Sequence, residues 1–68
     1  MCKTIEYQKV LAAYKGRKEH NSVIYDLLST ELDQENNDTF RHRIRACQEY
    51  LASQGLLMNV GYAIWQPI

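Results

Sequence analysis

The segment 37–45, NDTFRHRIR, concentrates the side chains of this chain that could recognise another molecule. It holds three arginines and one histidine, directly after an Asn-Asp pair that is typical of a helix start. Arginine can donate two hydrogen bonds to the edge of guanine, and it also pairs with phosphate. The segment therefore predicts either the start of a helix that reads a nucleic acid or the solvated side of an ordinary amphipathic helix.

The apolar residues of the same region define a helix and its buried face. They recur at i, i+4, i+7 and i+11, as Phe40, Ile44, Cys47 and Leu51. This spacing places them on one stripe about three turns long. We expect the helix to begin at the Asn37-Asp38 cap and to end at Gly55.

The stripe also sets the direction of the polar side chains. At about 100° of rotation per residue, His42 and Arg45 point outward, Arg41 and Gln48 lie on one flank, and Arg43 lies on the other. The predicted DNA base contacts are Arg41, His42, Arg45 and Gln48. Arg43 suits a phosphate contact or an ion pair within the protein. The alternative is a solvated face on which Arg45 pairs with Glu49 one turn later.

A second group of basic residues lies in the polar connection 15–20. Lys15, Arg17 and Lys18 are predicted to contact phosphates, which would raise affinity without sequence preference. The alternative for this segment is a plain exposed loop between two helices.

The acidic residues gather just before the arginines. Residues 26–38 contain five acids and no base. They could meet basic residues of a protein partner or of a second copy, whereas Asp38 alone suits capping of the following helix.

The remaining elements are two earlier helices and a C-terminal hairpin. A helix near 5–15 is predicted from Tyr7, Val10, Leu11 and Tyr14, which share one face, and a second from an Asn21 or Ser22 cap with an apolar side formed by Val23, Ile24, Leu27 and Leu28. Residues 56–58 and 62–65 read as strands, with a turn at 59–61. Tyr50 and Trp65 could form an exposed aromatic patch for self-association.

Composition limits the classes of function. The 68 residues fit one domain, 1–68, and eight acidic against eight basic residues give no net charge. There is no leader-like segment and no apolar run of bilayer-spanning length, so we expect a cytoplasmic protein outside the membrane. Cys2 and Cys47 fit a reducing compartment, where we expect no disulfide.

Motifs for metal binding and catalysis are absent from the sequence. Cys2, His20, His42 and Cys47 do not fall in a spacing that presets a zinc site, and there is no phosphate-cradling glycine loop or motif-placed catalytic triad. We therefore expect no metal, no cofactor and no enzymatic activity.

The order of these elements, with LASQGLLMNVGYAIW at the junction of the third helix and the hairpin, resembles the winged helix-turn-helix family of small bacterial or phage DNA-binding proteins. The resemblance covers nearly the whole chain. It implies an α+β fold of three helices and a short C-terminal β-hairpin, and a homodimer that binds double-stranded DNA through the third helix as a transcriptional or recombination accessory regulator. The alternative is a protein-protein interaction module, an adaptor or anti-repressor, that uses the acidic turn and the C-terminal aromatics.

Overall fold

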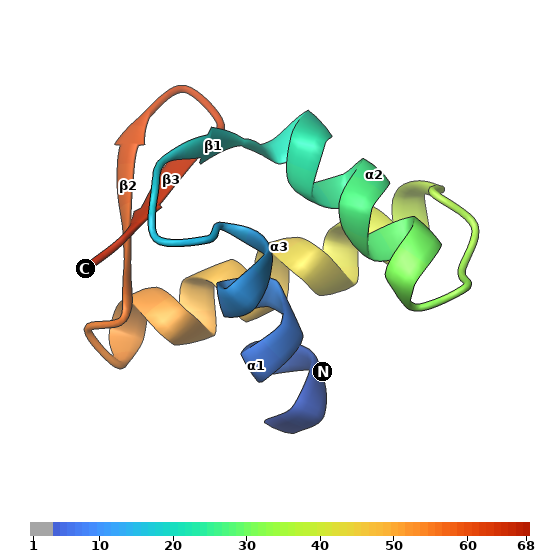
Figure 1. The fold of residues 1–68 in the computed structure, drawn as a ribbon, viewed down its shortest axis with the longest axis horizontal. Coiled ribbons are helices and arrows are strands. Elements are labelled where there is room, and N and C mark those ends of the chain that lie inside the picture. The colour runs from blue at the N-terminus through green and yellow to red at the C-terminus, as the bar shows by residue number, and fades with distance from the viewer. Residues whose placement is uncertain (1–3) are drawn as a thin grey trace.

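The structure is a computed structural model that describes residues 4–68, with side chains described from residue 6. The elements follow in the order α1 (Thr4–Ala13), β1 (Glu19–His20), α2 (Asn21–Glu31), α3 (Asp38–Ser53), β2 (Leu57–Gly61) and β3 (Ile64–Pro67). Figure 1 shows the helices packed together, with the strands gathered at one end of the molecule. The described residues therefore form an α+β fold with three helices and a small antiparallel sheet, as the sequence predicts.

The helix starts reflect local hydrogen bonds. The α3 N-cap is Asn37, as predicted, and its Oδ1 accepts a hydrogen bond from the N–H of Phe40 at 2.9 Å. The α2 N-cap is His20, whose Nδ1 accepts from the N–H of Ser22 at 3.0 Å. The prediction of Asn21 or Ser22 as this cap was wrong, because the Asn21 side chain is buried between the helices instead.

The sheet contains a strand that the sequence did not predict. β1 lies in the 15–20 connection and pairs with β3, Glu19 opposite Trp65 and His20 opposite Ile64, so that the strand order is β1-β3-β2. Two polar residues carry no period-2 apolar pattern, and only the neighbouring β3 makes them a strand.

The hairpin turn also lies later than predicted. β2 continues to Gly61, with a bulge between Asn59 and Gly61, and the chain reverses at Tyr62 and Ala63, where Ala63 has a φ of 56°. The bulge accommodates the Asn-Val-Gly segment within the strand, so these turn-prone residues do not make the turn.

The core lies between the three helices and extends under the sheet. The predicted α3 stripe is buried in full: Phe40, Ile44, Cys47 and Leu51. On α2, Ile24 and Leu28 are buried, whereas Val23 and Leu27 remain 40% and 43% exposed. Cys47 is disulfide-bonded, which contradicts the expected free thiol. The same expectation for Cys2 falls outside the described residues.

Candidate nucleic-acid interface

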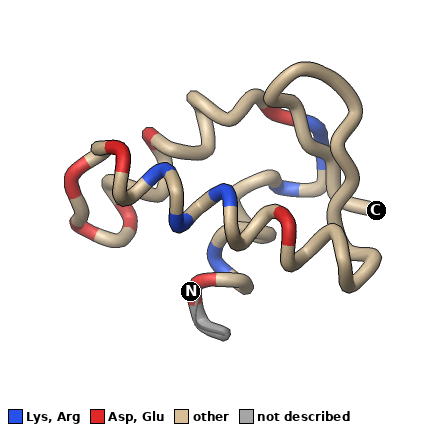
Figure 2. Tube along the Cα trace, turned by 180° about the vertical axis from the view of Figure 1, so that it is seen from behind, with Lys and Arg blue, Asp and Glu red and all other residues tan. Residues whose placement is uncertain are grey.

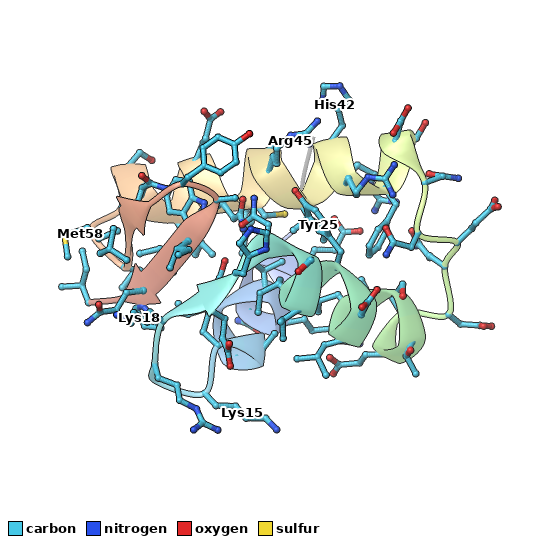
Figure 3. The ribbon with its side chains drawn as sticks, turned by 90° about the horizontal axis from the view of Figure 1, so that it is seen from above. Lys15, Lys18, Tyr25, His42, Arg45 and Met58 are labelled. Carbon is cyan, nitrogen blue, oxygen red and sulfur yellow. The ribbon has the colours of Figure 1, made fainter. Side chains whose placement is uncertain are left out.

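The open face of α3 is formed by the side chains that point away from the other helices. His42 and Arg45 are exposed there, and Figure 3 shows both on the outer side of α3. Within the described part of the chain, neither side chain makes a hydrogen bond or an ion pair, and the side chains of Arg45 and Glu49 do not pair. Burial of the α3 stripe holds this face in place, so these two side chains can meet a ligand without first breaking a contact.

Arg41 is held at the start of α3. Its guanidinium donates to the backbone O and the Oδ1 of Asn36, each at 3.0 Å, and forms an ion pair with Asp38. Its side chain is 33% exposed. Arg41 therefore braces the turn before α3, and contact with a base would require it to release these partners.

Arg43 is engaged within the protein. It forms an ion pair with Glu6 of α1, whose side chain is only 12% exposed, and donates to the Oε1 of Gln34 at 3.0 Å. The predicted phosphate contact of Arg43 is therefore corrected to the ion pair that the sequence left as the alternative. The pair ties α3 to α1 and removes one positive charge from the available set.

Gln48 was predicted to contact bases, and the structure contradicts this because its side chain is 1% exposed. Its Nε2 donates to the hydroxyl of Tyr14 and to the Oδ1 of Asn21, both at 2.8 Å. Asn21 in turn donates to the Tyr25 hydroxyl at 3.3 Å. Gln48 of α3 is therefore joined through a buried polar network to Tyr14, directly after α1, and to Asn21, the first residue of α2, and it cannot reach a ligand on the open face.

Replacing Gln48 by Met tests this network. Met keeps most of the side-chain volume but removes both donors, so the buried oxygens of Tyr14 and Asn21 lose a partner. We expect the free energy of unfolding to fall by about 2 kcal/mol, measured by urea denaturation. The matched control is Glu49→Met on the neighbouring exposed position, which we expect to change stability by less than about 0.5 kcal/mol. Equal effects of the two substitutions would contradict the network.

The predicted phosphate-contacting residues of the 15–20 connection are all exposed: Lys15, Arg17 and Lys18. Figure 3 shows Lys15 pointing to the side of the molecule opposite His42 and Arg45, with α1 between them. The structure therefore does not bring Lys15 into one surface with the open face of α3. A straight duplex lying along α3 would not contact this side chain.

Acidic residues gather in the loop that precedes α3, as Figure 2 shows, while basic residues follow along α3 itself. Asp33, Glu35 and Asp38 are all exposed. Asp38 is paired with Arg41, and Glu35 accepts a hydrogen bond from Asn37 at 3.3 Å. The acidic turn is thus partly neutralised by neighbours, but it still lowers the positive potential at the start of α3.

The predicted aromatic patch is exposed only in part, because Tyr50 is 42% exposed and Trp65 is half-buried. Tyr50 is stacked on Tyr7, with ring centroids 4.0 Å apart, and Trp65 is partly buried against the core. The sequence missed Tyr62, which is 94% exposed in the turn between β2 and β3. Its position after Gly61 was a signal that could have identified it, since a hairpin tip leaves its side chains without neighbours.

Comparison of the chain with family models, curated proteins and solved structures found no match. Among the described residues, no group of three or more His, Cys, Asp or Glu is placed to hold a metal ion. No helix within residues 4–68 combines the length and the apolar character needed to cross a bilayer.

Proposed function

We propose that the chain is a small winged-helix DNA-binding protein of the cytoplasm that inserts α3 into the major groove as a transcriptional or recombination accessory regulator. The observation that carries the proposal is the open face of α3, where Arg45 and His42 are exposed and unpaired within the described residues. The element order and the β1-β3-β2 sheet support a winged helix, with α2 and α3 as the helix-turn-helix and the β2–β3 turn as the wing.

Each exposed group has a chemical role in this proposal. Arg45 donates two hydrogen bonds to the O6 and N7 of guanine, and His42 donates or accepts one at a neighbouring base edge. Tyr62 at the wing tip offers a hydroxyl to a phosphate or sugar, a contact that positions the protein without reading sequence. Arg41 would add a further contact only after leaving Asp38.

The charge distribution implies weak binding by a single chain. Of the α3 arginines, Arg41 and Arg43 are paired with acids, and the acidic turn lies directly before the helix. Few phosphates are neutralised, so we expect a shallow dependence of affinity on salt. A second copy on a second half-site would raise the affinity of the assembly.

Replacing Arg45 by Ala tests the proposal. We expect the substitution to weaken DNA binding about tenfold, because it removes the pair of hydrogen bonds to guanine. Binding is measured by fluorescence anisotropy on random and genomic fragments at two salt concentrations. Lys15→Ala is the matched control, since it removes the same charge from the opposite side of the molecule, and we expect it to have little effect.

Two results would contradict the proposal. One is undetectable binding of the unmodified protein at low salt. The other is an equal loss of affinity in Arg45→Ala and Lys15→Ala, which would indicate general electrostatic attraction instead of groove reading by α3.

A protein-interaction module is the second candidate, favoured by the exposed acids Asp33 and Glu35. Tyr50 lies near the C-terminal end of α3, a helix of 16 residues and so about 24 Å long, and Trp65 lies on β3. A protein partner would therefore contact the acidic turn without the aromatics. In that case, replacing Asp33 and Glu35 by Asn and Gln would abolish partner binding, whereas Arg45→Ala would leave it unchanged.

A further inference from the structure

The outer edge of the sheet is formed by β2, which lies last in the order β1-β3-β2 and at the margin of the molecule in Figure 1. The N–H of Ile68 donates to the carbonyl of Leu56 at 3.1 Å, which makes these two residues a hydrogen-bonded pair of the antiparallel ladder. In an antiparallel pair, the backbone N–H and C=O groups of successive residues point alternately toward and away from the partner strand. Because those of Leu56 point toward β3, those of Leu57 and Asn59 face away from it. No strand among the described residues pairs with this edge.

The segment that contains this edge carries no charged side chain, and several of its apolar side chains are exposed. Residues 50–68 contain no Asp, Glu, Lys, Arg or His. Leu56, Met58 and Val60 are 44%, 47% and 42% exposed, and Ile68 is 75% exposed. Figure 3 shows Met58 at the margin of the molecule, pointing away from the helices.

Soluble proteins usually protect such an edge with a lysine, a proline or a bulge. β2 itself has no charged residue and no proline, and its bulge lies between Asn59 and Gly61. The bulge therefore leaves the regular part of the strand, from Leu56 to Asn59, open for pairing.

The occupant of this edge is defined by backbone geometry and by charge. The N–H and C=O groups of an extended edge form their hydrogen bonds with another strand. The segment 50–68 offers no charged side chain to a nucleic acid or a charged peptide. It fits a neutral strand with apolar side chains, and β2 of a second copy is such a strand. We propose that two copies of this chain pair antiparallel through β2, with Met58 at the two-fold axis.

The proposed register follows from the groups that face outward. Leu57 exchanges N–H···O bonds with Asn59 of the second copy, and Asn59 exchanges them with Leu57 of that copy. Met58 then lies opposite Met58 of the second copy in a non-hydrogen-bonded pair, where side chains approach most closely. The interface is isologous, so it closes after two chains.

This pairing replaces the predicted self-association through Tyr50 and Trp65. Those rings already have partners within the chain, since Tyr50 stacks on Tyr7 and Trp65 packs against the core. Within the described residues no strand pairs with the outer side of β2, and the apolar side chains near this strand remain exposed.

Cross-linking tests the register directly. Facing residues at a non-hydrogen-bonded antiparallel position have Cα atoms about 4.5 Å apart, which lies within the range of a disulfide. We expect the full chain with Met58→Cys to form a covalent dimer under mild oxidation, seen on a non-reducing gel. Val23→Cys is the matched control, because Val23 is similarly exposed but lies on α2. Equal cross-linking of the two variants would overturn the register, since it would reflect random collision.

A charge substitution tests the interface itself. Met58→Lys places two like charges at the axis, and we expect the dimer dissociation constant to rise at least tenfold, measured by light scattering over a concentration series. The control is Val23→Lys, which should leave the dimer dissociation constant unaltered. Circular dichroism of both variants checks that they remain folded. A mass of one chain for the unmodified protein at the highest concentration, or an unchanged constant in Met58→Lys, would overturn the proposal. All measurements are made without DNA, so their failure is distinct from failure of the proposed function.

Discussion

Leu28→Ala is expected to lower the free energy of unfolding by about 3 kcal/mol, whereas Leu27→Ala should lower it by no more than about 1 kcal/mol. The two residues are neighbours on α2, but Leu28 is fully buried and Leu27 is 43% exposed. Truncating Leu28 removes buried methyl groups and leaves a cavity between the helices, while solvent fills the space left by Leu27. Urea denaturation of both variants measures the difference.

The size of this effect matters in so small a domain. A chain of 68 residues has a total stability of roughly 3 to 10 kcal/mol. Leu28→Ala should therefore populate unfolded chains at moderate temperature. Similar decreases in the free energy of unfolding of the two variants would contradict this packing. They would mean that α2 is rotated about its axis and contacts α3 through a different face.

Alkaline unfolding is the second large expected effect. Burial raises the pKa of Tyr14 to about 12, because the hydroxyl is removed from water, while the hydrogen bond from Gln48 acts in the opposite direction. In the unfolded chain the hydroxyl ionises near pH 10. The folded state therefore keeps its proton longer, and this contribution to stability is fully present below pH 10 and is lost as the pH rises through 12. The loss amounts to roughly 3 kcal/mol across this window.

Tyr14→Phe isolates this contribution from the other groups that titrate at high pH. The variant should be less stable near pH 7, because the Gln48 amide loses one acceptor. Its stability should nevertheless fall less steeply between pH 10 and 12 than that of the unmodified protein. Parallel pH profiles of the two proteins would contradict the assignment to Tyr14.

The buried face of a helix could be predicted where apolar residues recur at helical spacing over several turns. All four residues of the α3 stripe are buried, and Asn37 caps the helix as predicted. The exposure of His42 and Arg45 follows from that stripe, because burial of one side of a helix directs the other side to solvent. Along α2, by contrast, the apolar cluster did not reveal that Ile24 and Leu28 pack inward while Val23 and Leu27 do not.

The sequence by itself determined the α3 helix, its buried face and its open basic face, because these depend on contacts within three or four residues of each other. Only the tertiary structure decided which polar side chains remain available. Gln48 is paired with Tyr14, 34 residues away, and Arg43 with Glu6, 37 residues away. No local pattern encodes such partners, since they meet only when α1 and α2 pack on α3. The same holds for β1, a strand of two residues that exists because β3 lies beside it.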